Sequence, residues 1–290
     1  EELKSAPERF LNRELSWLAF NQRVMDEANN LAHPLFERLR FLSISASNLD
    51  EFYMVRMAGL MAQVRNNITE RSTDGLTPQQ QINAIHRRTL LMTEDIQLCW
   101  RDMMQELAQN DIQILSRADL GKNDKKWLGK KFEHDIMPLL TPIAVDSSHP
   151  FPFIPNKGLC IALHLFNGDK NEDLDALIPI PQSLERFIRL PGDKPRYILV
   201  EKVIMMHLGH LFAKPMELRQ YATFRVTRDT EMDIDSDAED LVRTFESALK
   251  KRRRGRVIHL SVHHNINSET LAFLMNQLNV QEQQVYPVDG

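Results

Sequence analysis

The sequence predicts a multidomain chain: an all-α antiparallel helical bundle followed by an α+β domain with a mixed or antiparallel sheet. Its 290 residues suit about two domains of ordinary size. Apolar residues recur at helical spacing through the first part of the chain, and short β-rich runs begin only after Asn110. We therefore expect a helical domain over residues 1–110 and an α+β domain over residues 111–290.

Two helices are predicted first. One begins at Asn12 or Arg13 and ends near residue 30. The other begins at Pro34, whose missing N–H costs nothing in a first helical turn, and its apolar pattern extends to about residue 68.

The stretch SASNLDEF, residues 45–52, interrupts this second pattern with small and polar side chains. Asn48 followed by Glu51 matches a capping pattern, because an amide oxygen can accept from the free N–H groups of a new helix. On this interpretation one helix ends near Ser45 and another begins after Asn48. A ligand facing that N-terminus and the spare donors of the amide is the functional interpretation, and both can hold.

A third long helix follows the loop NITERSTDGLTP. Thr77 is its predicted cap and Pro78 its first residue, and the helix continues to roughly Asn110. Helices joined by short loops in this way pack as an antiparallel bundle.

The second part alternates short strands with helices, which indicates an α+β domain. Strands are predicted at residues 112–115, 159–166, 176–181, 196–200, 223–228 and 256–262. Helices are predicted around residues 124–137, 201–212, 236–254 and 268–278. The end, VYPVDG, has no predicted element, and because the chain also lacks an initial Met we expect a segment of a longer protein.

Composition excludes several classes of protein. The net charge is -4 and the pI about 6.2, so no whole-surface attraction to nucleic acid or to an anionic membrane is expected. No apolar run approaches the roughly 18 residues of a membrane span, and the start is too charged for a signal peptide. Two cysteines, Cys99 and Cys160, form no Cys-x-x-Cys pair, which favours a reducing, cytoplasmic setting.

Motifs for phosphate or metal binding are weak. The chain contains neither G-x-G-x-x-G nor G-x-x-x-x-G-K. His207 and His210 share a helical face, but no third ligand accompanies them, so a partly buried helix face is favoured over a metal. His263 and His264 are expected on opposite sides of a strand. The segment SSHPFPF, residues 147–153, indicates a rigid loop more than a nucleophilic serine.

A basic cluster, KKRRRGR from Lys250 to Arg256, carries six cations in seven positions. It ends a predicted helix that starts with a capping box, Ser236 to Glu239, and Gly255 is the expected C′ residue. Acids at the positive end and bases at the negative end complement the helix dipole. A polyanion-binding site is the alternative interpretation.

Four segments of the chain resemble the N-terminal part of bacterial polyphosphate kinase, of the type that is phosphorylated on histidine. They are NRELSWLAFNQRV (12–24), FERLRFLSISASNLDEFYMVRMAGL (36–60), LLTPIAVDSSHPFPF (139–153), and FRVTRD with AEDL (224–229, 238–241). The resemblance implies reversible transfer of the terminal phosphate of ATP to polyphosphate through phosphohistidine. It also implies a helical domain, a head domain that forms a homodimer, and two further catalytic domains that are absent from this chain.

The resemblance implies one site residue here. Asn48 matches the asparagine of the family's S-N-N-L-D-E-F motif that contacts ATP near its base, although Ser47 replaces the preceding asparagine. None of the ten histidines is followed two places on by lysine, so the nucleophile and the arginines that bind Mg²⁺ or phosphate are expected beyond residue 290. The segment alone should be inactive, contributing ATP positioning and dimer assembly. The alternative is a purely structural or oligomerisation module with a basic polyanion-binding patch.

Overall fold

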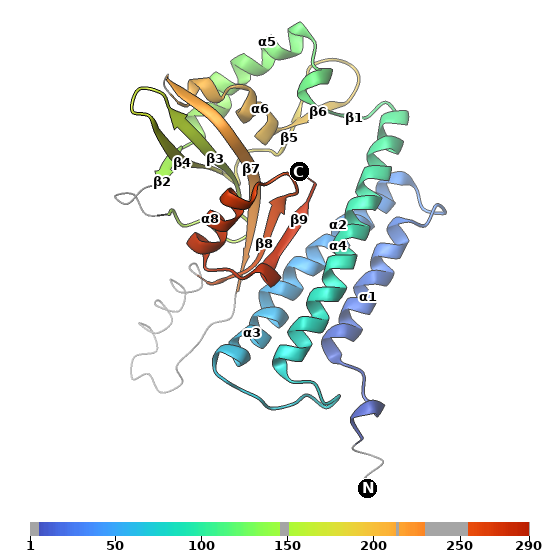
Figure 1. Cartoon of the computed structure of the whole chain (residues 1–290). Helices are drawn as coiled ribbons and strands as arrows, with labels where there is room; N and C mark the ends of the chain where they lie inside the picture. The colour runs from blue at the N-terminus through green and yellow to red at the C-terminus, as the bar shows by residue number, and fades with distance from the viewer. Residues whose placement is uncertain (1–5, 146–150, 213–214, 230–254, 290) are drawn as a thin grey trace, which may run out of the picture. The chain divides into compact units, whose positions relative to one another are not determined.

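The computed structural model describes residues 6–145, 151–212, 215–229 and 255–289 (Figure 1). The chain divides into two compact units. The first unit consists of Glu1–Met103, Thr227–Leu260 and Val280–Tyr286. The second unit consists of Met104–Val226, Ser261–Asn279 and Pro287–Gly290.

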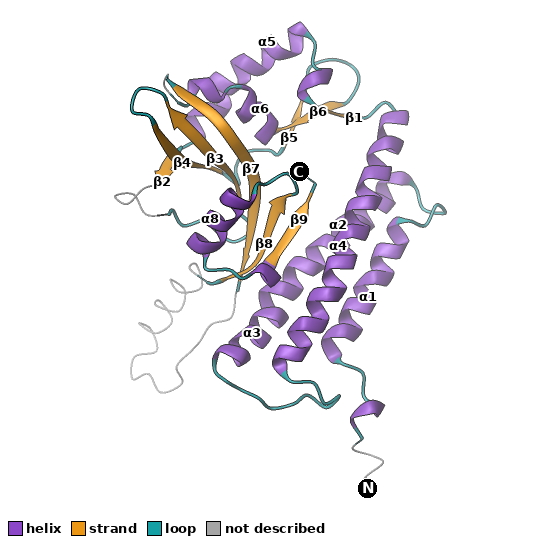
Figure 2. Ribbon diagram, viewed as in Figure 1, coloured by secondary structure: helices purple, strands orange, loops and turns teal. Residues whose placement is uncertain are grey.

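Helices form most of the first unit (Figure 2). After a short 3-10 turn (Pro7–Arg9), they are α1 (Arg13–Ala28), α2 (Leu35–Phe52), a π-helical turn (Tyr53–Met57), α3 (Ala58–Arg65) and α4 (Pro78–Gln109), which continues into the second unit. Buried apolar side chains hold these helices together, among them Leu18, Leu49, Phe52, Met57, Ile85 and Met92. None of the helices within the described ranges is both long and apolar enough to cross a membrane.

Two predicted helix starts are confirmed. The Asn12 side chain accepts hydrogen bonds from the backbone N–H groups of Glu14 and Leu15 at 3.1 and 3.0 Å, so α1 begins where the sequence places it. At α4, Thr77 Oγ1 accepts from the N–H of Gln80 at 3.3 Å, and Gln80 Oε1 accepts in return from the N–H of Thr77 at 2.9 Å. This reciprocal pair is a capping box.

The predicted helix start at Asn48 is wrong. α2 continues from Leu35 to Phe52, and Asn48 lies in its interior. The amide of Asn48 does not cap its own helix. Its Nδ2 donates a hydrogen bond to Oδ1 of Asn21 in α1, at a distance of 3.0 Å. Asn48 therefore serves a contact between two helices, and the irregularity comes later, in the π turn.

Two sheets contain the described strands. A six-stranded sheet has the order β2-β4-β3-β7-β8-β9 and a three-stranded sheet the order β1-β6-β5. The strands of the larger sheet are β2 (Ile143–Val145), β3 (Leu159–Asn167), β4 (Glu172–Ile180), β7 (Met216–Arg228), β8 (Val257–His263) and β9 (Val285–Val288). Those of the smaller sheet are β1 (Gln113–Leu115), β5 (Phe187–Arg189) and β6 (Arg196–Leu199).

The strands pair in both parallel and antiparallel directions. β3 pairs antiparallel with both β4 and β7, whereas β1 pairs parallel with β6. The fold class is therefore confirmed, and so are the six predicted strands. Three short strands, β2, β5 and β9, were not predicted, and the expectation of no element at VYPVDG is wrong because β9 lies there.

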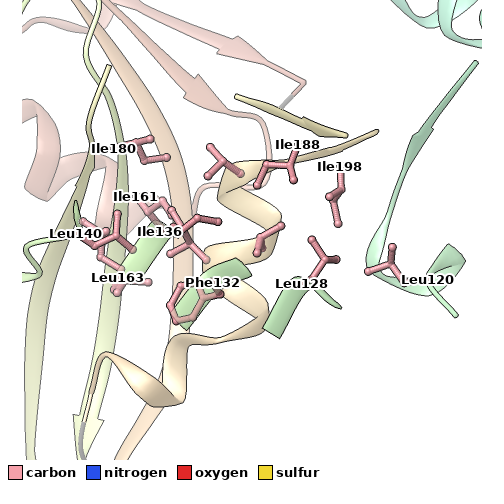
Figure 3. Packing of buried hydrophobic residues seen from close by; sticks show 14 of the residues in the cluster. Leu120, Leu128, Phe132, Ile136, Leu140, Ile161, Leu163, Ile180, Ile188 and Ile198 are labelled. Carbon is pink, nitrogen blue, oxygen red and sulfur yellow. The ribbon is translucent and has the colours of Figure 1, made fainter. Parts of the chain in front are cut away.

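Helices α5 (Lys122–Lys131), α6 (Val200–Met206) and α8 (Ser268–Leu278) accompany the strands of the second unit. Its core joins buried side chains of α5, of the π turn that follows it (Phe132–Ile136), of the strands and of α6. Figure 3 shows part of this core, including Leu128, Phe132, Ile161, Ile188 and Ile198. The predicted helix at 236–254, its capping box, and Ser147 to His149 lie outside the described residues.

Candidate functional site

A groove of about 610 Å³ lies in the first unit, between α1 and the continuous segment of α2, the π turn and α3. From α1 it is lined by Arg13, Glu14, Trp17 and Phe20. From the other side its lining includes Asn48, Glu51, Phe52, Val55 and Arg56. Its volume falls in the range of roughly 300–1,000 Å³ that is usual for small-molecule sites.

Helical periodicity explains why these residues meet. Residues three or four apart lie on one side of a helix, so positions 13, 17 and 20 of α1 face the groove together, as do positions 48, 52 and 55. The π turn carries Val55 and Arg56. Such turns often occur at functional sites, because they re-aim the side chains of one turn within an otherwise regular helix.

The one site residue that the sequence predicted lines this groove. The side chain of Asn48 is half-buried, and its Nδ2 donates to Oδ1 of Asn21 at 3.0 Å. Asn21 is fully buried, and its own Nδ2 donates to the backbone oxygen of Ser45 at 3.0 Å.

Asn21 was not singled out from the sequence, although a signal was present. It occupies the buried face of α1, which it shares with Leu18, Met25 and Ala28. Asparagine at an apolar position of a helix is rarely left without a buried partner, because an unsatisfied amide in a core is costly. A search for polar residues on predicted core faces would have found it.

Aromatic rings form most of the apolar part of the groove, with Val55 and Leu60. The rings of Trp17 and Phe52 stack with their centroids 5.0 Å apart and their planes at 24°. Phe20 and Val55 are 49% and 45% exposed, so both offer apolar surface to a ligand. A flat, partly apolar ligand such as a nucleotide base suits these walls.

Charge in the groove is balanced. Its lining contains two arginines, Arg13 and Arg56, and two glutamates, Glu14 and Glu51. Arg56 Nη1 lies 3.3 Å from Glu14 Oε1, with the two side chains 28% and 15% exposed, so Glu14 neutralises one of the two cations. The groove therefore lacks the excess positive charge that a triphosphate requires.

The histidine pairs do not form a metal site. His207 stacks on Phe132 with ring centroids 4.8 Å apart, and its Nδ1 bonds the backbone oxygen of Val203. Within the described residues no group of three or more His, Cys, Asp or Glu side chains could hold a metal ion.

One expectation about the other pair is wrong. The rings of His263 and His264 stack on each other with centroids 4.5 Å apart rather than pointing to opposite sides of a strand. The reason is that β8 ends at His263, and the chain turns at His264. The basic cluster lies outside the described residues except for Gly255 and Arg256.

Comparison with known proteins identifies the family. The family model for the polyphosphate kinase N-terminal domain matches residues 10–115, and that for the polyphosphate kinase middle domain matches residues 123–290. The chain belongs to the polyphosphate kinase family.

Individual relatives agree. Polyphosphate kinase of Erythrobacter litoralis is 44% identical over 283 residues, which are 98% of this chain and 39% of the relative. That of Parasynechococcus marenigrum is 37% identical over 297 residues, which are 98% of this chain and 42% of the relative. The crystal structure of polyphosphate kinase from Porphyromonas gingivalis superposes with a TM-score of 0.78 at 25% identity, over 97% of this chain and 39% of that one. The chain thus spans about two fifths of these relatives.

Proposed function

We propose that this chain is the N-terminal and head portion of a polyphosphate kinase. The whole enzyme would move the terminal phosphate of ATP reversibly to polyphosphate through a phosphohistidine. Membership of the family over residues 10–115 and 123–290 supports this proposal. Residues 1–110 would act as the helical domain and residues 111–290 as the head.

The groups that break the bond would lie elsewhere in such an enzyme. No histidine here stands two places before a lysine, so the chain offers no match to the expected nucleophile. Mg²⁺, which the resemblance implies, has no fitting ligand set in the described part of the chain, and we assign no step to it here. Alone, the chain would be inactive as a phosphotransferase.

The role left to this chain is to hold the base end of ATP. The observation that carries this proposal is that Asn48 lines a groove together with the aromatic rings of Trp17, Phe20 and Phe52. Aromatic rings stack with a purine, and an amide pairs with its edge. Balanced charge fits the base and disfavours the phosphates, which would then extend toward basic groups outside this chain.

Substitution of Asn48 tests this role. We expect Asn48→Ala to weaken ATP binding by about tenfold, because an amide that pairs with a base is worth about 1–3 kcal/mol. Isothermal titration of the chain with ATP measures the affinity, and the KM for ATP reports the same loss in an enzyme of the relatives' full length.

Ser47→Ala is the matched control, since Ser47 is the exposed neighbour of Asn48 on the same helix and does not line the groove. Its ATP affinity should equal that of the wild type. An Asn48→Ala variant that folds and binds ATP as tightly as Ser47→Ala would exclude the proposed contact.

Two more assignments accompany the proposal. A homodimer formed through the head is favoured by exposed apolar side chains in the second unit, among them Phe187, Leu218 and Tyr221. Cys99 and Cys160 are both free and buried, which suits a cytoplasmic protein. The basic cluster remains a second candidate function, as a polyanion-binding patch.

A further inference from the structure

We propose that Asn21 is a positioning residue that fixes the orientation of the Asn48 amide and so makes the groove select adenine over guanine. The inference rests on the proposed function, in which Asn48 meets the base of the nucleotide. It concerns a buried residue that makes no contact with the ligand itself.

The orientation of Asn21 follows from its partners. Its Nδ2 lies 3.0 Å from the backbone oxygen of Ser45 and 3.4 Å from Sδ of Met92. Both partners can only accept hydrogen bonds, so the NH₂ end of the amide must face them. Rotating the amide by half a turn would set its oxygen against the carbonyl oxygen and leave buried polar groups unsatisfied.

Asn21 in turn determines the orientation of Asn48. With its NH₂ committed, Asn21 presents only Oδ1 to the neighbouring amide, at 3.0 Å. An oxygen there requires a donor, and Asn48 must therefore turn its Nδ2 inward. Because Asn21 is fully buried between Leu18 and Met25, which are also fully buried, this arrangement is held by the packing of α1.

Asn48 then has a defined pattern left for a ligand. Its Nδ2 has given one hydrogen to Asn21 and keeps the second, beside an Oδ1 that accepts no hydrogen bond from the described residues. An acceptor next to a donor is the pattern that pairs with adenine, whose amino group donates beside a ring nitrogen that accepts. Guanine places an oxygen where adenine has its amino group, and that oxygen would face Oδ1.

Without Asn21 the Asn48 amide could turn over. Its NH₂ could then meet the guanine oxygen as readily as its oxygen meets the adenine amino group. Asn21 would therefore control the ratio of the affinities for ATP and GTP more than it controls the affinity for ATP. A residue with a general packing role would not change this ratio.

Titration of the chain and its variants with ATP and with GTP tests this. We expect the wild type to bind ATP about tenfold or more tighter than GTP. In Asn21→Leu the ratio should fall toward one, because leucine offers no acceptor to Asn48. In Asn21→Asp the ratio should be retained even if the melting temperature falls, because a carboxyl oxygen still accepts from Nδ2.

Thr89→Val is the matched control. Thr89 is a fully buried polar residue of α4 that does not line the groove, so its loss should lower stability without moving the ratio. Asn21→Ala, for which the same fall is expected, replaces the leucine variant where leucine prevents folding.

Three results would overturn the inference. A wild-type chain that binds ATP and GTP equally would do so, as would a ratio that survives in folded Asn21→Leu or Asn21→Ala while Asn48→Ala loses ATP. The second of these results would still support the proposed contact between Asn48 and ATP. If Asn48→Ala keeps its ATP affinity, the proposed function fails together with the inference.

Discussion

At the scale of single residues, the proposed function of the groove depends on two hydrogen-bonded amides. Asn48 would touch the ligand, and Asn21 holds Asn48 in one orientation through a hydrogen bond of 3.0 Å. Trp17 adds an aromatic wall, and Glu14 cancels the charge of Arg56. Each of these side chains acts through a neighbour from another helix, so the groove depends on how α1 and α2 pack.

A histidine in the second unit gives a pH-dependent prediction. His164 Nδ1 lies 3.0 Å from Asp175 Oδ1 and its Nε2 3.7 Å from Asp173 Oδ1. The hydrogen bond to Asp175 raises the pKa of His164, with added attraction from Asp173 and Glu269. Because the folded pKa lies above the unfolded one, the stabilisation is complete below about pH 6.5 and is lost as the pH rises through the folded pKa.

We therefore expect His164→Gln to lower the free energy of unfolding more at pH 5.5 than at pH 8.5. Urea unfolding of the wild type and the variant at both pH values measures this. The exposed His134→Gln is the control, and its effect should be small at both. If the difference in free energy of unfolding between the wild type and His164→Gln is constant or grows with pH, the predicted stabilisation by protonated His164 is contradicted.

At the scale of elements, the groove depends on a helix that continues past Asn48. α2, the π turn and α3 run without a break from Leu35 to Arg65, so Asn48, Val55 and Arg56 remain in one wall. A helix start at Asn48 would have turned its amide toward its own backbone. The contact with Asn21 offers the amide a partner within a continuous helix instead.

The start of α4 carries a prediction at this scale. Thr77→Ala removes the side-chain acceptor for the N–H of Gln80, so we expect the free energy of unfolding to fall by about 1 kcal/mol. Ser43→Ala, at an exposed position inside α2, should change it by less than about 0.5 kcal/mol. Chemical denaturation compares them, and equal effects would show that the cap contributes nothing.

The whole molecule spans about two fifths of the relatives it resembles. An aromatic groove without excess positive charge can hold one end of a nucleotide, and transfer of a phosphate needs basic groups and a nucleophile as well. On the proposed function, this chain would carry the binding role without the catalytic one.

Assembly is the prediction that belongs to this scale. If the head forms the homodimer, the 33.7 kDa chain should sediment as a species of about twice its mass as its concentration is raised. Analytical ultracentrifugation over a concentration series measures the association. A clean monomer at the highest concentration would argue against the head as a sufficient dimer module.

The sequence by itself determined what depends on near neighbours in the chain. The caps at Asn12 and Thr77 and the six predicted strands follow from side chains within a few residues of each other. The strands that it missed, β2, β5 and β9, have three or four residues each, too few for a pattern of their own, and their pairing defines them. The resemblance to a family predicted Asn48 as a site residue, whereas the local pattern wrongly predicted it to be a helix cap.

Only the tertiary structure decided what Asn48 does. Its partner Asn21 lies 27 residues earlier in the chain, on a different helix. A hydrogen bond of that kind exists only once α1 and α2 have packed, and it outweighs the local capping pattern because it satisfies the amide oxygen of Asn21, which is fully buried. The same packing brings the rings of Trp17 and Phe52 together beside that amide. Local pattern can place a polar residue on a helix, but only the packing of a second helix determines which of its atoms faces a ligand.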